Sequence, residues 1–240
     1  MSCQHQDKKK GLDLTAAIRI LENTGRGDPR LPEDDPDTQT QKIIDALCAV
    51  SIHDGLTGLM NATFFYAILA REIERSIRTG RNCGLMVIDV DHFKKINDTF
   101  GHGVGDNVLR AVAAHIKHNL RGMDTAARIG GEEFAIILPE CEPADAIHAA
   151  MRIHSGLNPL ALSAGEQTLQ LTTSGGLVWT SPAVRITSLS LVAEADREMY
   201  RAKQSGRGRL CYKNLDSTMV SRRERTALLN LQAEENKHDR

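Results

Sequence analysis

After Asp54 the chain alternates between helical and extended patterns, and this alternation restricts the fold more than any other feature of the sequence. The order is helix, strand, helix, β-hairpin, helix, strand and helix. The hairpin, with a two-residue Gly-Gly turn, is predicted in TAARIGGEEFAIILP, residues 125–139, and the last strand in LQLTTSGGLVWT, residues 169–180. Residues 83–93, CGLMVIDVDHF, form a continuous apolar run that ends in two aspartates, which is typical of a strand buried on both faces. The pattern predicts an α/β fold in which helices flank a mixed central sheet.

The segment before Asp54 predicts a helical extension of residues 1–53. Residues 12–24 carry apolar side chains at helical spacing, and residues 25–37 combine glycine, proline and acidic side chains, as linkers do. A second helix is predicted over residues 38–53, on which Ile43, Leu47 and Val50 repeat with four–three spacing. This seam could pair with a copy of itself as a dimerisation helix, or it could pack on the main domain, residues 54–213. The charged tail, residues 214–240, is expected to be solvated, although residues 222–236 could continue as a helix.

The sequence totals restrict the partners and the compartment. The formal net charge is −1, so the composition as a whole does not attract nucleic acid or an anionic membrane. The cysteines are scattered without a metal-ligand spacing, as expected for free thiols in a reducing compartment. The polar start of the sequence does not resemble a secretory signal, and no apolar run is long enough to span a membrane. We therefore expect a cytoplasmic protein with neither a nucleic-acid nor a membrane partner.

Acidic residues mark the expected ends of two strands. Asp89 and Asp91 close the apolar run, and Glu132 and Glu133 open the second strand of the hairpin, directly after a pair of glycines. If these strands are neighbours, three or four carboxylates converge at one end of the sheet, where Mg²⁺ and a large anionic ligand could bind. The alternative is a plain Gly-Gly hairpin turn with a solvated acidic rim. The hairpin alone favours this alternative, whereas Asp89 at the end of a second strand favours the cation site.

Several blocks in a fixed order resemble one protein family. They are HDGLTGLMN, DVDHFKKINDTFGHGVGD, RIGGEEF, SGG and ADREMYRAKQSGRGR, and together they resemble the GGDEF family of diguanylate cyclases over about residues 54–210. Members of that family join two GTP molecules into cyclic di-GMP and release pyrophosphate, on a fold similar to the polymerase palm and the nucleotidyl cyclase core. The resemblance implies an enzyme that uses Mg²⁺, or Mn²⁺, with two ions per active site. Because each site holds one GTP, it also implies a homodimer with two-fold symmetry.

The resemblance implies metal-binding and catalytic roles for residues of the acidic strand ends. Asp89, Glu132 and the carbonyl of Val90 correspond to metal ligands. Glu133 corresponds to an acid that binds metal or helps to activate the attacking 3′-hydroxyl, and the two roles remain open. The catalytic residues implied are therefore Asp89, Glu132 and Glu133.

Substrate contacts are implied in the same way. The corresponding residues are Phe93, Lys94, Asn97, Asp106, Gly131, Lys203 and Arg207. Asn97 and Asp106 would read the guanine edge, and the glycine would let base or ribose approach the backbone closely. The Phe-Lys pair lies in a turn whose backbone N–H groups would hold phosphates. Lys203 and Arg207 would clamp phosphates, since they lie four residues apart at the end of a predicted helix and could face one anion.

A second nucleotide site is implied by RGMD, residues 121–124, which stands at the spacing of the family's inhibitory RxxD motif. Arg121 and Asp124 would bind cyclic di-GMP as a product inhibitor, with Arg152 on the next helix as a second arginine. The alternative is a surface salt bridge, which is how an isolated RxxD is usually read.

The sequence departs from the family pattern without losing a residue that corresponds to a metal or base ligand. Ala62 and Thr63 stand where two arginines are usual, Ile129 replaces an aromatic residue, and Glu132 replaces the commoner aspartate. We therefore expect an active enzyme. The alternatives are a catalytically weak relative that binds GTP or cyclic di-GMP as a receptor, and an interaction scaffold. The N-terminal helices could also bind a regulatory protein.

Overall fold

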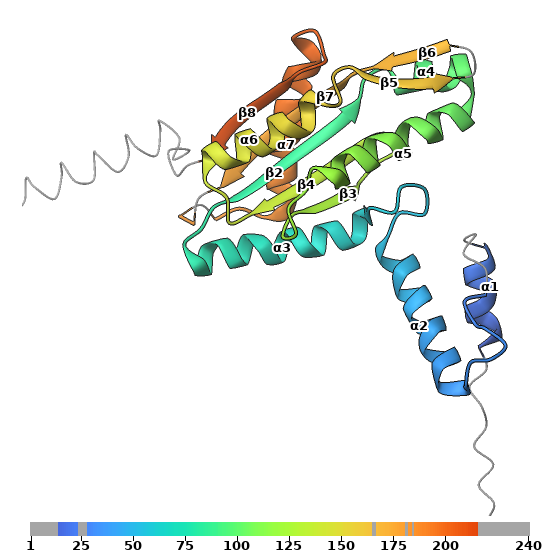
Figure 1. The fold of residues 1–240 in the computed structure, drawn as a ribbon. Helices are drawn as coiled ribbons and strands as arrows, with labels where there is room; N and C mark the ends of the chain where they lie inside the picture. The colour runs from blue at the N-terminus through green and yellow to red at the C-terminus, as the bar shows by residue number, and fades with distance from the viewer. Residues whose placement is uncertain (1–13, 24–27, 165–166, 181, 184, 216–240) are drawn as a thin grey trace, which may run out of the picture. The chain divides into compact units, whose positions relative to one another are not determined.

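The computed structural model describes residues 14–23, 28–164, 167–180, 182–183 and 185–215. It divides between Gly55 and Leu56 into two compact units (Figure 1). Within the described ranges, no helix combines the length and the apolar character that a membrane crossing requires. The segment 222–236, which could continue as a helix, lies outside the described residues.

The first unit contains the helices α1 (Thr15–Asn23) and α2 (Pro36–Ile52). Helix α2 begins two residues before its predicted start, because Asp35 caps it by accepting hydrogen bonds from the backbone N–H groups of Asp37 and Thr38. Leu21 of α1 and Ile43 of α2 are fully buried, and the two helices contact each other. Ile43, the first residue of the predicted seam, is therefore not free on the surface of α2.

The second unit is built on a six-stranded sheet with the order β1-β3-β4-β2-β7-β8. Its strands are β1 (Met60–Asn61), β2 (Cys83–Val90), β3 (Thr125–Arg128), β4 (Glu133–Pro139), β7 (Thr173–Thr180) and β8 (Leu210–Leu215). Strand β2 lies in the middle and pairs antiparallel with both β4 and β7, whereas β1 pairs with β3, and β7 with β8, in parallel. The sheet is thus mixed, as the sequence predicts.

Helices cover both faces of this sheet (Figure 1). One face packs against α3 (Ala62–Thr79) and α7 (Ser188–Gln204), and the other against α5 (His102–His118) and α6 (Pro143–Ser155). Alternate side chains of β2 enter the two cores: Met86 and Ile88 pack with α5 and α6, and Leu85 and Val87 with α3 and α7. Burial on both faces explains the continuous apolar run, and it confirms the predicted α/β fold.

The structure corrects the predicted elements in the second half of the chain. The single strand expected at residues 169–180 is interrupted at Thr172, and its first part belongs to a separate two-stranded sheet of β5 (Leu160–Ala164) and β6 (Gln167–Leu171). Strand β6 is mostly exposed, whereas every residue of β7 is buried, so the two parts occupy different environments. The short strand β1, the edge strand β8 and the helix α4 (Phe93–Phe100) are additional elements that the sequence pattern did not predict.

The β3–β4 hairpin is present, but its turn differs from the prediction. The loop runs over residues 129–132, with the Ile129 N–H donating to the Glu133 carbonyl at 2.9 Å. Neither Gly130 nor Gly131 has a positive φ, so the pair does not form the predicted two-residue turn, whose type I′ geometry needs positive φ at both positions.

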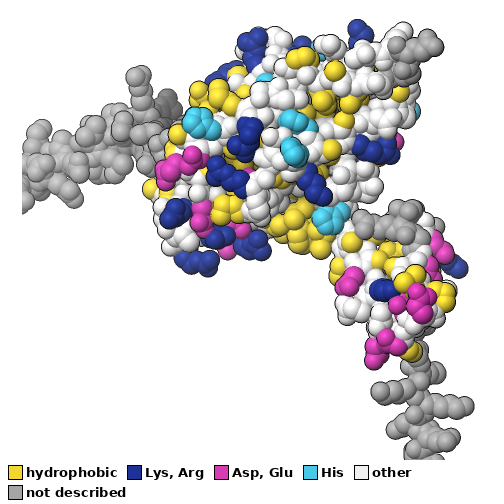
Figure 2. All heavy atoms as spheres, viewed as in Figure 1, with side chains coloured by type: hydrophobic (Ala, Val, Ile, Leu, Met, Phe, Trp, Pro, Cys, Tyr) yellow, Lys and Arg dark blue, Asp and Glu magenta, His cyan; other side chains and the backbone are white. Residues whose placement is uncertain are grey.

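Charged side chains of both signs are distributed over the surface. On the face drawn in Figure 2, Lys and Arg side chains of the second unit are interspersed with histidines and hydrophobic residues, and acidic side chains gather on the helical first unit. This arrangement agrees with a net charge near zero.

Gly176 of β7 allows α7 to approach the sheet closely. A Cβ at this position would lie 2.1 Å from the Ala195 carbonyl oxygen and 2.4 Å from the Met199 backbone nitrogen. We expect Gly176→Ala to lower the free energy of unfolding by about 2 kcal/mol, because the backbone of α7 must move away from the sheet. Gly103→Ala is the control, since no atom lies within 4 Å of a Cβ there. Urea denaturation measures both, and equal stabilities of the two variants would contradict this account of the packing.

Candidate active site

The predicted acidic residues lie together at one edge of the sheet. Strands β2 and β4 are antiparallel neighbours, so the end of β2 meets the start of β4, and Asp89 is paired with Glu133 in the register. The Val90 N–H donates to the Glu132 carbonyl at 3.2 Å, which continues the pairing into the turn. We call the carboxylates of Asp89, Glu132 and Glu133 the acidic edge.

Burial and mutual repulsion make the acidic edge a place that favours positive charge. Burial raises the pKa of Asp89, which is only 5% exposed, and of both glutamates. The charge of Asp89 raises the pKa of Glu132 and Glu133 further. Lys203 of α7 opposes these shifts, with its Nζ 2.8 Å from Asp89 Oδ2.

The donor set of the acidic edge fits a hard divalent cation. Its side chains offer only carboxylate oxygens, which Mg²⁺ and Mn²⁺ prefer. Burial raises the pKa of all three, so a bound cation would offset the cost of ionising them. Nevertheless, no three His, Cys, Asp or Glu side chains in the described part of the chain are arranged to hold an ion by themselves. Further oxygen ligands, such as phosphate, would have to complete the site.

Asp91 does not belong to the acidic edge, although the sequence groups it with Asp89. Its carboxylate accepts hydrogen bonds from Thr172 Oγ1 and Ser174 Oγ, both at 2.7 Å, and from the Gly208 N–H at 3.0 Å. The side chain is buried and joins the end of β2 to β7 and to the turn after α7. Three carboxylates rather than four therefore converge, because Asp91 lies beyond the end of β2 and its carboxylate is hydrogen-bonded to β7 and the two turns beside it.

Arg207 reaches this region by a different route from the predicted one. Helix α7 ends at Gln204, so Arg207 lies in the following turn, with a left-handed φ of 61°. The expected helical spacing between Lys203 and Arg207 is therefore wrong. Arg207 Nε lies 4.0 Å from Asp91 Oδ1, and Lys203 contacts Asp89, so the two cations still flank the same strand end.

The packing of α4 against α5 brings Asn97 beside Gly105, the residue that precedes Asp106. A Cβ on Gly105 would lie 1.9 Å from Asn97 Oδ1, so this glycine makes room for the amide. Asn97 Oδ1 is buried and has no hydrogen-bond partner among the described residues. A buried acceptor without a partner is costly, and a ligand N–H would satisfy it.

Phe93 and Lys94 form the first turn of α4. The preceding residue, His92, is left-handed (φ 59°) and makes no side-chain cap, so its side chain does not occupy the N–H groups of this turn. The Phe93 side chain is buried in the core, whereas Lys94 is exposed. Phe93 can therefore contact a phosphate only through its backbone N–H group, and not through its side chain.

Arg128, for which the sequence pattern predicted no role, stabilises the turn that carries the acidic edge. Arg128 donates to the Gly131 carbonyl oxygen from Nη2 at 2.7 Å and from Nε at 3.2 Å. No described atom lies within 4 Å of a Cβ on Gly131, so the protein itself does not require glycine there. The space beside Gly131 is open to a ligand.

Asp196 is a second residue that the sequence analysis missed. It lies two helical turns before Lys203 on α7, and its charge raises the pKa of Glu133. Burial raises the pKa of Asp196 itself, and Lys203 opposes that shift. The helical spacing of Asp196 and Lys203 in ADREMYRAK could have placed both on one face of α7.

Arg121 and Asp124 follow the end of α5, and Arg152 of α6 lies near Asp124. The Arg121 backbone N–H donates to Asp124 Oδ2 at 2.8 Å, and Arg152 Nη2 donates to the Asn119 carbonyl at 3.0 Å. Burial raises the pKa of Asp124, while both arginines lower it. Among the ion pairs of the described residues, none joins the Arg121 and Asp124 side chains, so the alternative of a simple salt bridge finds no support.

The mixed sheet with an acidic edge and helices on both faces places the second unit in the class of palm-like and nucleotidyl-cyclase-like α/β domains. Residues 51–209 match the family described as diguanylate cyclase, GGDEF domain, and the chain therefore belongs to the GGDEF family.

Curated relatives share this domain with the chain. The probable diguanylate cyclase DgcC of Escherichia coli K12 is 38% identical over 163 residues, which are 68% of this chain and 43% of DgcC. The response regulator PleD of Caulobacter vibrioides is 39% identical over 166 residues, which are 68% of this chain and 36% of PleD. The chain thus spans less than half the length of these relatives.

Two solved structures extend the similarity over more of the chain. The diguanylate cyclase SiaD of Pseudomonas aeruginosa, solved in complex with its activator SiaC, has a TM-score of 0.65 and 35% identity, covering 83% of this chain and 74% of that one. The coiled coil and GGDEF domain of DgcB from Caulobacter crescentus, solved with cyclic di-GMP, has a TM-score of 0.69 and 27% identity, covering 84% of this chain and all (100%) of that one.

Proposed function

We propose that the chain is a diguanylate cyclase, which condenses two GTP molecules into cyclic di-GMP and releases two pyrophosphates. The observation that carries this proposal is the acidic edge, where three carboxylates meet beside Lys203. Membership of the GGDEF family and the diguanylate cyclases among its relatives support the choice of reaction.

In each half of this reaction a 3′-hydroxyl oxygen of one GTP bonds to the α-phosphorus of the other. The bond from that phosphorus to the leaving pyrophosphate breaks, and the hydroxyl gives up its proton. Glu133 lies at the acidic edge with a raised pKa, which suits it to accept that proton. Lys203 and Arg207 would neutralise phosphate charge, and the first turn of α4 would donate its backbone N–H groups to phosphate oxygens.

The residues proposed to hold the metal are Asp89, Glu132, Glu133 and the carbonyl of Val90, with two Mg²⁺ per site and Mn²⁺ as a substitute. When bound, such ions lower the pKa of the attacking hydroxyl and neutralise the leaving pyrophosphate. Their positive charge would also offset the burial that raises the pKa of all three carboxylates, and the repulsion from Asp89 that raises the pKa of both glutamates.

Guanine is proposed to bind between α4 and α5. The unpartnered Asn97 Oδ1 would accept from a base N–H, and the Asp106 carboxylate would accept from another. Adenine lacks donors at the matching positions of its Watson–Crick edge, so both acceptors would favour guanine. Gly131 would let the nucleotide approach the backbone, because the space beside it is open.

The test of the proposed function is the direct detection of product. The purified full chain is incubated with GTP and Mg²⁺, and the nucleotides are separated by chromatography. We expect cyclic di-GMP and two pyrophosphates per product molecule. Binding of GTP or cyclic di-GMP without any turnover, at Mg²⁺ and enzyme concentrations that support the active relatives, would contradict the proposal and favour a receptor.

We also propose that two copies act together, since one chain provides a single set of site residues and the product needs two GTP molecules in opposed orientations. The first unit is proposed to influence this encounter, either through α2 or through a regulatory protein. Support comes from its exposed apolar side chains, Ile20, Leu31 and Ile44, and from SiaD, which was solved with an activator.

Product inhibition is proposed at Arg121, Asp124 and Arg152. The two arginines are exposed and lie near a half-buried carboxylate, so they are available to phosphates and a guanine edge. DgcB, one of the structural neighbours, was solved with cyclic di-GMP, which supports the choice of ligand.

We expect Arg121→Ala to relieve inhibition by cyclic di-GMP, raising its inhibition constant about tenfold or more, because an arginine–phosphate contact is lost. Initial rates at several product concentrations measure this effect. Arg110→Ala, on the exposed face of α5, is the matched control and should leave inhibition unchanged. If cyclic di-GMP inhibits the Arg121 variant and the parent enzyme equally, Arg121 does not belong to a product-inhibition site.

A further inference from the structure

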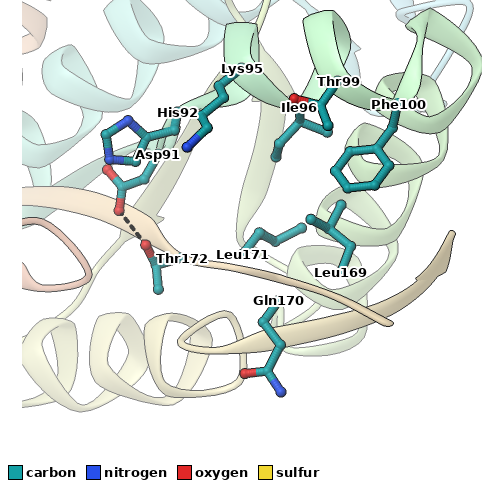
Figure 3. A pocket seen from close by; sticks show the side chains of 10 residues that line it. All are labelled: Asp91, His92, Lys95, Ile96, Thr99, Phe100, Leu169, Gln170, Leu171 and Thr172. Carbon is teal, nitrogen blue, oxygen red and sulfur yellow. Dashed lines mark hydrogen bonds between the residues drawn. The ribbon is translucent and has the colours of Figure 1, made fainter. Parts of the chain in front are cut away.

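A cavity of about 420 Å³ lies on the face of α4 opposite to the proposed guanine site. It is enclosed between α4 and β6, and Figure 3 shows the side chains that line it. Neither Asn97 nor Asp106 lines this cavity, and neither does any residue of the acidic edge. The volume lies within the range of small-molecule sites, about 300–1,000 Å³.

The two ends of the cavity differ in chemistry. Ile96, Phe100, Leu169 and Leu171 form an apolar part, and His92 and Lys95 stand together at the other end (Figure 3). Lys95 makes no ion pair within the described ranges. The Asp91 carboxylate is also at this end, but its oxygens accept from Thr172, Ser174 and Gly208 rather than from the two basic side chains. An apolar body with one anionic group matches this lining.

The walls of the cavity are two short elements outside the main sheet. Strand β6 belongs to the separate two-stranded sheet, and α4 is a helix of eight residues. Left-handed or positive φ values bracket α4, at His92 (59°) and Gly101 (84°). Such residues can absorb a rotation of the helix between them, so a change in the spacing of α4 and β6 would move the whole helix.

We propose that this α4–β6 cavity is a second ligand site, which binds a small organic anion with an aromatic or branched apolar body. Lys95 and His92 bind the anionic group, and the apolar side chains pack on the body. Because Asn97 stands on the opposite face of the same short helix, the ligand also changes the affinity for GTP. This coupling rests on the proposed guanine site, whereas binding in the cavity does not.

Titration of the full chain with 2-naphthoate, followed by two-dimensional NMR of the backbone amides, tests the proposal. We expect saturable binding that shifts the amides of α4 and β6, and at least about tenfold weaker binding of the neutral 2-naphthamide, because a charge-assisted contact is lost. Lys95→Gln should weaken naphthoate binding about tenfold as well. Lys117→Gln, an exposed lysine of α5, is the matched control and should bind like the parent.

Leu169→Trp fills the cavity from β6 without changing α4, and it should abolish naphthoate binding. A circular dichroism melt shows whether this variant is folded. If it is not, naphthoate binding by Lys95→Gln and the positions of the shifted amides test the site instead. Three results would each overturn the site: equal affinity for 2-naphthoate and 2-naphthamide, amide shifts confined to elements other than α4 and β6, or unchanged naphthoate binding in a folded Leu169→Trp variant.

We further expect saturating naphthoate to change the dissociation constant of a non-hydrolysable GTP analogue at least about fivefold. An unchanged constant would overturn only the coupling, and failure to make cyclic di-GMP would leave the cavity result standing.

Discussion

Replacement of Glu133 by glutamine is expected to lower kcat for cyclic di-GMP formation by about 10²- to 10³-fold, the range seen when one electrostatic catalytic group is removed. The amide keeps the shape of the side chain but neither accepts the hydroxyl proton nor supplies negative charge to a metal. A coupled pyrophosphate assay with saturating GTP and Mg²⁺ measures the loss. Glu142→Gln, at the exposed start of α6, is the control and should retain the parent rate.

The stability of the same variant separates lost chemistry from lost folding. Burial raises the pKa of Glu133 in the folded state above its unfolded value, so the ionised carboxylate destabilises the fold. This cost is absent below the unfolded pKa and grows as the pH rises through the folded pKa. Near pH 7 without divalent metal, Glu133→Gln should therefore melt at the same temperature as the parent or higher. A lower melting temperature together with the lost activity would indicate a folding defect and not a catalytic role.

Loss of guanine discrimination is the second large effect that we expect. Asn97→Ala should lower kcat/KM for GTP about 100-fold, because one hydrogen bond is lost and a base N–H remains unsatisfied in a buried site. The kcat/KM for ATP, which we expect to be low in the parent, should change little. The ratio of kcat/KM for GTP to kcat/KM for ATP should therefore fall by a similar factor.

The neighbouring asparagine offers a matched control for this experiment. Asn107 is exposed on α5, where its Oδ1 accepts from Arg110, so Asn107→Ala should preserve both the rate and the preference for GTP. Steady-state rates with each nucleotide at several concentrations give kcat/KM. An equal loss for GTP and ATP in Asn97→Ala would show that Asn97 supports the fold of α4 and does not read the base.

The strongest sequence patterns gave the elements that position the acidic edge. Strand β2 is apolar throughout because both faces are buried, and α5 repeats its apolar residues at helical spacing. The hairpin then needed only antiparallel pairing with β2 to bring Glu132 and Glu133 beside Asp89. These features could be predicted because each depends on the local periodicity of one segment.

Features that depend on contacts between distant segments could not be predicted. The extended pattern of residues 169–180 gives no sign of the break at Thr172, which the hydrogen bond from Thr172 to Asp91 stabilises. Likewise, the Asp91 carboxylate accepts hydrogen bonds from Ser174 and Gly208, which lie far away in the sequence. Helical spacing could not predict the position of Arg207, because α7 ends before this residue and the geometry of the following turn determines where its side chain lies.

We propose that the acidic edge and Lys203 together hold a metal-bound guanosine triphosphate. A crystal structure of the full chain with Mn²⁺ and a GTP analogue that cannot cyclise tests it most directly, because the anomalous signal of manganese locates each ion. We expect manganese within coordination distance of Asp89 and Glu132, with the triphosphate at Lys203 and the base against Asn97. Manganese or nucleotide bound elsewhere, with Asp89 still paired to Lys203, would contradict it.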